Sequence, residues 1–372
     1  MFEQLKIVII TLVLALFSCS IKSSDTTYIT ENINFYNKTA NIKIAGTLTY
    51  PKGKGPFPTV VLIPGSGTAN RDGSDNTIHR PLFEIARYLS TNGMAVLRCD
   101  KRGVGESEGV LDFNTTLADL ASDIKASIDF LNNNPIADKK HLGLIGHSYG
   151  GVVAAKVAEG LPSVSFVVLM ASPGIKQGEI VSQQLSDIPK TFGVDESTIE
   201  KFQVIIDSTM ILLSSKENSE IQSEKIEEMY KRQIRQITDA EIEAMSSTGY
   251  VFQRDAQLYA RLIKMPFWHE FYTLDPGTIY KHLKYPVLSV IGENDLQVRP
   301  GPNQEAIEMA LKAGKNKNYT IKTLKGMNHL FQKSKSGSPL EYNKTGETMS
   351  KSFLDKLYNW ILSQPDKRNN NE

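Results

Sequence analysis

Cysteine is scarce in this sequence, and neither sign of charge is in excess. The 372 residues include only two cysteines, Cys19 and Cys99, so a disulfide-stapled scaffold and a four-cysteine zinc site are both excluded. Lys and Arg total 42 against 41 for Asp and Glu, a net charge of +1. Binding of nucleic acid through overall charge needs a clear basic excess and is not expected. With 40% hydrophobic and 22% charged residues, the composition is that of a globular protein rather than a disordered or polytopic membrane protein.

A long apolar run occurs at the N-terminus. Residues Ile7 to Phe17 are apolar except for one Thr, and they follow Lys6. A bilayer-spanning helix needs about 20 residues, so this shorter run predicts a secretory signal peptide, with a buried or amphipathic helix as the alternative. The run ends in L-F-S-C, which resembles the bacterial lipobox, with Cys19 as the lipidated residue. We therefore expect an exported protein, held at the membrane only by this lipid anchor, in the periplasm or at the surface of a bacterium, or otherwise secreted.

Short β-branched runs alternate with segments of helical apolar spacing along most of the chain. Leu117 to Leu131 is the clearest helix, with apolar residues three and four positions apart. Strands are expected at 41–50, 59–64, 95–99, 141–145, 166–170, 286–291 and 319–324, and helices at 82–90, 117–131, 151–159 and 349–362. This alternation predicts an α/β fold with a mostly parallel central sheet flanked by helices.

The stretch from Gly174 to Leu283 breaks the alternation. It has few strand-like runs and is rich in Glu, Lys, Gln and Ile, which predicts a mainly helical insertion. The expected organisation is a signal peptide at 1–18, a tether at 19–30, the first part of the core at 31–173, the helical insertion at 174–283, the second part of the core at 284–363 and a polar tail at 364–372.

A glycine-rich turn joins an expected strand to an expected helix. It reads Gly146-His147-Ser148-Tyr149-Gly150, the G-x-S-x-G pattern in the strand–turn–helix context of a nucleophile elbow. Such a turn is so tight that the residues two before and two after the serine must lack bulk, and both are glycine here. Ser148 is therefore the predicted nucleophile, and an incidental glycine-rich turn is the alternative.

A serine hydroxyl is a weak nucleophile unless a base activates it. Among six histidines only His329 follows the last expected strand, where the base lies when the chain order is Ser, Asp, His. Asp295, in G-E-N-D after the penultimate strand, is the predicted acid that orients the imidazole, and Glu293 is its competitor. The predicted oxyanion hole consists of the backbone N–H groups of Tyr149 and Ser66. An ordinary tight turn is the alternative for the glycines around Ser66.

From Ile42 onward the chain resembles the α/β-hydrolase superfamily. The segments P-G-S-G-T-A-N-R-D-G (64–73) and D-K-R-G-V-G-E-S (100–107) are similar to those of bacterial carboxylesterases near the dienelactone-hydrolase and serine-aminopeptidase branch. The resemblance implies the α/β-hydrolase fold, with Arg71 and Asp72 bracing a loop and with the insertion as a helical lid after the sixth strand. Family members often carry His where this chain has Pro64.

The leading hypothesis is a serine esterase that cleaves small-molecule carboxylic esters through an acyl-enzyme intermediate. This chemistry requires no metal and no cofactor. The alternative is a serine peptidase of the prolyl or aminopeptidase type, which shares the triad. A catalytically inactive surface binding protein is a further alternative, against which the intact Ser, Asp and His in the right order argue.

Overall fold

The computed structural model describes residues 27–74, 78–161, 163–252 and 254–364. The expected signal peptide, Cys19, most of the tether and nearly all of the polar tail lie outside these residues. Within the described ranges, no helix combines the length and apolar character needed to cross a bilayer.

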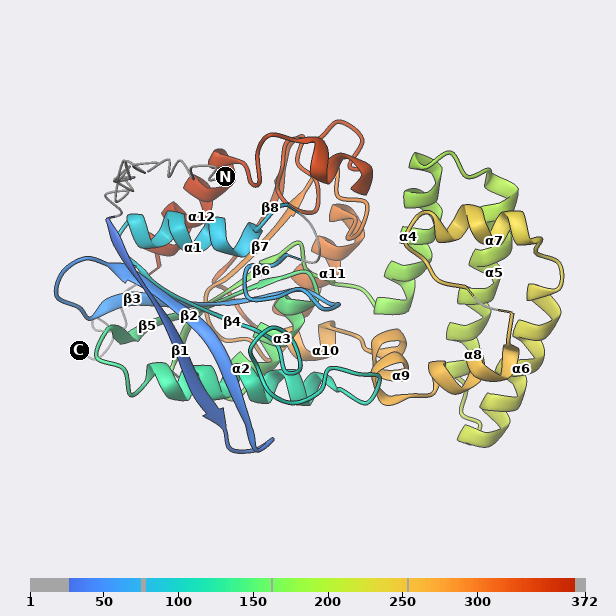
Figure 1. Ribbon diagram of the computed structural model, residues 1–372, viewed down its shortest axis with the longest axis horizontal. Helices are drawn as coiled ribbons and strands as arrows, with labels where there is room; N and C mark the ends of the chain where they lie inside the picture. Colours follow the sequence, from blue (N-terminus) through green and yellow to red (C-terminus); the bar gives the residue numbers. More distant parts are fainter. Residues whose placement is uncertain (1–26, 75–77, 162, 253, 365–372) are drawn as a thin grey trace, which may run out of the picture.

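An eight-stranded sheet forms the centre of the fold (Figure 1). Its spatial order is β1-β2-β4-β3-β5-β6-β7-β8. β1 pairs antiparallel with β2, and β2 with β4, whereas all later neighbours pair parallel. The strands are β1 Tyr28–Asn37, β2 Ile42–Pro51, β3 Phe57–Ile63, β4 Ala95–Cys99, β5 Ala137–His147, β6 Val164–Met170, β7 Val287–Gly292 and β8 Tyr319–Leu324. The predicted mostly parallel sheet is confirmed.

Helices cover both faces of the sheet because side chains of the central strands alternate between two apolar cores. In β3, Val61 and Ile63 face one core, and Val60 and Leu62 face the other. The first core is completed by α2 Leu117–Leu131, α3 Tyr149–Ala158, α10 Gly277–Tyr280 and α11 Pro300–Ala313. The second is completed by α1 Pro81–Thr91 and α12 Lys351–Leu362, which lie on the opposite side of the sheet in Figure 1.

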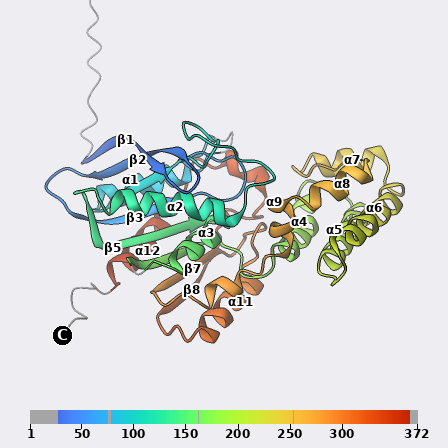
Figure 2. The same cartoon turned by 90° about the horizontal axis from the view of Figure 1, so that it is seen from below.

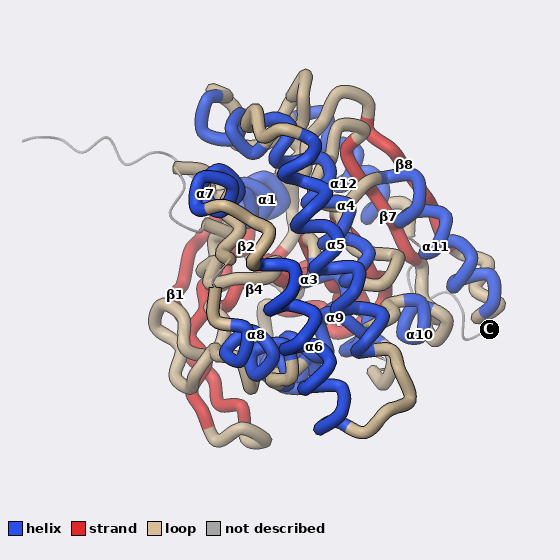
Figure 3. The backbone as a smooth tube through the Cα atoms, turned by 90° about the vertical axis from the view of Figure 1, so that its right-hand side faces the viewer, coloured by secondary structure: helices blue, strands red, loops and turns tan. Residues whose placement is uncertain are grey.

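The segment between β6 and β7 forms a separate helical lobe beside the sheet (Figure 2). Its helices are α4 Gln177–Thr191, α5 Glu196–Leu213, α6 Ser219–Ile234, α7 Asp239–Ser246, α8 Ala256–Ile263 and α9 Pro266–Thr273. Figure 3 looks at this lobe along the long axis, with α5 and α6 in front of the strands. The lobe has an apolar core of its own, which includes Phe202 and Tyr230. Its two ends meet where the N–H of Gln177 donates to the carbonyl of Leu274 at 3.4 Å.

The elements differ from those expected at several places. Tyr28–Thr30 belong to β1 rather than to a tether, and β1 escaped detection because most of its side chains are exposed. The inserted lobe ends before α10, since Ile279, Tyr280 and Leu283 pack into the core beneath the sheet. Helix α11 was not expected either, although Ile307 is fully buried there.

Candidate active site

Ser148 occupies a strained turn between β5 and α3. Its φ of 54° and ψ of −128° lie in a region that non-glycine residues rarely adopt. A Cβ on Gly146 would lie 2.1 Å from the carbonyl oxygen of Gly150, and a Cβ on Gly150 would lie 2.4 Å from that of Ile63. Both glycines are therefore required by the close approach of backbone to backbone, which holds Ser148 at the carboxyl end of β5.

Asp295 and His329 form a buried hydrogen-bonded pair. The Nδ1 atom of His329 lies 2.8 Å from the Oδ2 atom of Asp295, and the two residues are 3% and 2% exposed. The other carboxylate oxygen accepts the N–H groups of Gln297 and Val298, each at 2.8 Å. With Nδ1–H donating to the carboxylate, Nε2 is left as the lone-pair nitrogen that a general base needs.

The loop that carries His329 lies against the elbow. His147, the residue before Ser148, donates from Nε2 to the carbonyl oxygen of His329 at 3.0 Å, and the two imidazole rings are 4.7 Å apart between centroids. Desolvation, together with the neighbouring His329, lowers the pKa of half-buried His147 to about 3. The neutral ring is therefore maintained as the donor in this contact.

The competitor acid Glu293 has another partner. Its Oε2 atom accepts the N–H of Gly326 at 2.9 Å, in the turn after β8. A Cβ on the nearby Gly292 would lie 2.3 Å from the carbonyl oxygen of Met327, so the end of β7 and the loop before His329 are in close contact. The structure thus pairs Asp295, not Glu293, with the predicted base.

The two predicted oxyanion donors flank the serine. Tyr149 is the first residue of α3, where backbone N–H groups have no intrahelical acceptor and the helix dipole favours negative charge. On the other side, a Cβ on Gly65 would lie 3.1 Å from the Cβ of Ser148, so the loop after β3 packs on the serine. In the described parts of the chain no acceptor is found for the N–H of Ser66.

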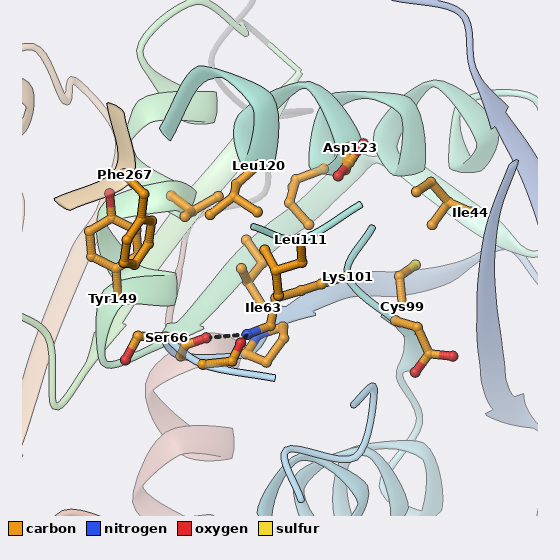
Figure 4. Close-up of a pocket in the computed structure, with 16 residues that line it drawn as sticks. Ile44, Ile63, Ser66, Cys99, Lys101, Leu111, Leu120, Asp123, Tyr149 and Phe267 are labelled. Carbon is orange, nitrogen blue, oxygen red and sulfur yellow. Dashed lines mark hydrogen bonds between the residues drawn. The ribbon is translucent and has the colours of Figure 1, made fainter. Parts of the chain in front are cut away.

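A small cavity opens next to these donors (Figure 4). Its volume is about 40 Å³, and Ser66 and Tyr149 border it. The remaining wall is largely apolar and comes from several elements, namely Leu111, Leu120, Ile124, Val153 and Phe267. Phe267 belongs to α9, so the helical lobe contributes to this cavity as well as the core.

Charged residues brace the loop after β3. Buried Asp100 accepts from the backbone N–H of Arg71 at 2.8 Å and from its Nε at 3.0 Å. Burial opposes ionisation of Asp100, but the hydrogen bonds from Arg71 and from the N–H of Glu106 lower its pKa. Asp72 in turn pairs with Arg80 and with buried Arg98. The bracing role expected for Arg71 and Asp72 is confirmed by these contacts.

Sequence reasoning missed two side chains at this site, His147 and Lys101. Each of them binds backbone carbonyls, His147 that of His329 and Lys101 those of Gly65 and Gly67. Every residue has a backbone carbonyl, so a contact with one cannot be inferred from residue types, and no motif could have indicated either contact. His147 also occupies the variable position of the elbow, where the motif specifies no residue.

Known proteins resemble this chain in sequence and in fold. Residues 79–246 match the family model described as serine aminopeptidase, S33, a match that contains Ser148 but ends before Asp295 and His329. The chain is 25% identical over 322 residues to esterase EstD of Thermotoga maritima, covering 86% of this chain and 65% of that protein. It therefore spans just under two thirds of the length of this relative.

Two solved structures extend the comparison to nearly the whole chain. The Pyrococcus furiosus esterase Pf2001 aligns with a TM-score of 0.53 at 16% identity, over 91% of this chain and 92% of that one. The proline iminopeptidase of Mycobacterium smegmatis aligns with a TM-score of 0.53 at 13% identity, over 90% and 98%. This chain has the α/β-hydrolase fold, as the sequence predicted.

Proposed function

We propose that this chain, an α/β-hydrolase by fold, is a serine esterase that cleaves small-molecule carboxylic esters through an acyl-enzyme. The observation that carries the proposal is the buried 2.8 Å hydrogen bond between His329 and Asp295, in a loop that lies against the strained turn of Ser148. The esterase relative that covers most of this chain supports the same class of reaction.

Each group has a defined part in the proposed reaction. The Oγ atom of Ser148 attacks the ester carbonyl carbon while Nε2 of His329 takes its proton, and Asp295 stabilises the imidazolium. The N–H groups of Ser66 and Tyr149 bind the developing oxyanion. His329 then protonates the departing alcohol. Water, activated by the same nitrogen, attacks the acyl-enzyme and releases the carboxylic acid, which restores the serine hydroxyl.

The cavity beside Ser66 and Tyr149 supplies the place for the acyl group. Its volume of about 40 Å³ is well below the ~150 Å³ of an apolar cavity that accepts benzene. Short acyl chains fit such a space, and long ones do not unless the walls move. The helical lobe would act as the lid, with α9 closing one side of the cavity through Phe267.

A serine peptidase is the second candidate, favoured by the family description and by the proline iminopeptidase among the fold neighbours. A peptidase of this type needs a carboxylate to hold the amino terminus of its substrate. Glu270 lies on α9 and its neighbour Phe271 packs 6.0 Å from the ring of Tyr149. However, Glu270 already accepts the N–H of Leu117 at 2.8 Å. Because Glu270 is engaged by the protein's own backbone, esters are the favoured substrates.

The test compares p-nitrophenyl acyl esters with aminoacyl p-nitroanilides, using wild type, Ser148→Ala and the exposed control Ser246→Ala. We expect ester hydrolysis to fall at least ~10³-fold in Ser148→Ala and to be unchanged in the control. A fluorophosphonate should label wild type but not Ser148→Ala. Labelling that survives the substitution would remove Ser148 as nucleophile, and faster turnover of the anilides would make the protein a peptidase.

A further inference from the structure

Lys101 grips the loop that carries one of the proposed oxyanion donors. Its Nζ atom donates to the carbonyl oxygen of Gly65 at 2.7 Å and also to that of Gly67. These two carbonyls stand on either side of Ser66. In Figure 4 the lysine side chain runs along the cavity toward this loop. The structure therefore places one cation against the peptide group that contains the donor N–H, Gly65–Ser66, and against the carbonyl of Gly67 two peptide groups later.

Because the peptide bond is planar, the contact of Lys101 with the Gly65 carbonyl also fixes the direction of the Ser66 N–H. The bond between Gly65 and Ser66 is trans, since the only cis bond in the described residues is Gly55–Pro56. In a planar trans peptide the C=O and the N–H point to opposite sides. With the carbonyl of Gly65 held by Lys101, the N–H of Ser66 must point away from the ammonium group. If this peptide flipped, the carbonyl of Gly65, and not the N–H of Ser66, would point away from the ammonium group.

Glycine gives the backbone of this loop conformational freedom. Two of its residues are glycines, and Gly67 has a φ of 74°, so the backbone around Ser66 has more freedom than an ordinary loop. The salt bridge of Arg71 with Asp100 holds the far end of the loop. Asp100 and Lys101 are consecutive, so the segment after β4 secures the loop at two points, and the lysine is the one that binds the carbonyls next to Ser66.

We infer that Lys101 is a positioning residue that keeps the Ser66 N–H directed into the oxyanion hole, an inference that rests on the proposed function. Lys101 does not touch the reacting atoms. Its effect belongs to the transition state, because the oxyanion forms only after Ser148 attacks. Loss of the ammonium group should therefore lower kcat and leave substrate binding nearly intact.

The experiment uses the full chain with Lys101→Met, Lys101→Arg and Lys125→Met. Methionine keeps an unbranched apolar stem along the cavity but removes the donors, whereas arginine restores them. Lys125 is an exposed lysine on α2 that pairs with Asp129, and serves as the matched control. Steady-state kinetics on p-nitrophenyl acetate would be measured together with the inhibition constant of a boronic acid, which forms a tetrahedral adduct at the serine.

In Lys101→Met we expect kcat to fall about 10- to 100-fold, part of the loss seen when an oxyanion donor is removed, with KM changed less than about threefold. The boronic acid should bind more weakly by the same factor as kcat/KM falls. Arginine should recover part of the loss, and Lys125→Met should match wild type. If Lys101→Met raises KM without lowering kcat, or leaves both unchanged, the inference is wrong.

Two other outcomes are separable. Should Lys101→Met melt well below wild type, Lys101→Leu and Lys101→Arg are compared at a temperature where both are folded, and equal kcat values for these two would overturn the inference. If wild type turns over no ester at all, the proposed function fails, and the role of Lys101 fails with it.

Discussion

The residues around Ser148 act in two ways, through the bulk that the glycines lack and through hydrogen bonds to backbone carbonyls. The pairing of His329 with Asp295 could be predicted from their places after the last two strands, and Ser148 as the nucleophile stays a prediction. The side chains that hold them could not be predicted, because His147 and Lys101 bind carbonyl oxygens that become neighbours only after folding. The glycines of the elbow were predictable from their spacing, and the structure supplies the distances that make them necessary.

Gly150→Ala should destabilise the protein by about 1–3 kcal/mol, a typical cost of overpacking, and reduce ester hydrolysis. The reason is that the added Cβ would lie 2.4 Å from the carbonyl oxygen of Ile63. Gly160→Ala is the control, since a Cβ there has nothing within 4 Å. Urea denaturation and p-nitrophenyl acetate assays measure both effects. Equal behaviour of the two variants would contradict the prediction.

The imidazole of His147 should make the fold sensitive to acid. Its pKa is lowered to about 3 in the folded protein, against an ordinary value of 6.5. Below pH 6.5 the unfolded chain takes up a proton that the folded chain refuses, so stability falls as the pH drops from 6.5 toward 3, by at most ~1.4 kcal/mol per pH unit. Above pH 6.5 this contribution is constant.

His147→Gln removes this titration while keeping an amide donor. We expect the free energy of unfolding, measured in urea at pH 6.5, 5.5 and 4.5, to fall less steeply in this variant than in wild type. The exposed His282→Gln should keep the wild-type slope. Identical slopes in all three proteins would show that His147 does not titrate in this way.

At the scale of elements, buried strands were predictable and exposed ones were not. β6 is a run of seven buried residues, and its apolar sequence indicates a strand directly. β1 has mostly exposed side chains, so its pairing with β2 comes from backbone hydrogen bonds that the sequence does not display. Helix α2 matches its expected bounds, because its apolar spacing is regular and Thr116 forms a capping box with Asp119.

Helix α2 should set the size of the acyl group through Leu120, which is half-buried and borders the cavity. Leu120→Ala enlarges this space, so the preferred p-nitrophenyl ester should shift to a longer chain. Each well-placed methylene is worth about 10-fold or more in kcat/KM. Leu161→Ala, also half-buried against the same core but away from the cavity, should keep the wild-type preference. A matching shift in both variants would remove the cavity as the acyl pocket.

On the scale of the whole molecule, the sheet core and the helical lobe are two packed units. The lobe was predictable as an interruption of the strand–helix alternation. The C-terminal end of the lobe was not predictable, because α10 follows the lobe without a break in the sequence pattern yet packs into the core beneath the sheet. The lobe has an apolar cluster of its own, and its two ends lie side by side where Gln177 contacts Leu274. The two parts of the core could therefore be joined by a short linker in place of the lobe.

Replacing residues 178–273 with a short Gly-Ser linker should therefore leave a folded core. We expect a single cooperative thermal transition by circular dichroism and retained fluorophosphonate labelling of Ser148. Discrimination between ester chain lengths should weaken, because Phe267 is removed from the cavity wall. An unfolded or unlabelled product would mean that the lobe is part of the core's folding unit.

The division of the site along the chain also bears on protein synthesis. Ser148 and both proposed oxyanion donors precede the lobe, whereas Asp295 and His329 follow it. A nascent polypeptide released from the ribosome before its final segment is translated would carry the proposed nucleophile without its proposed base. Hydrolysis of a chromogenic ester would thus report only completed chains. Two fragments produced by a cut inside the lobe would need to reassociate before they could hydrolyse the ester.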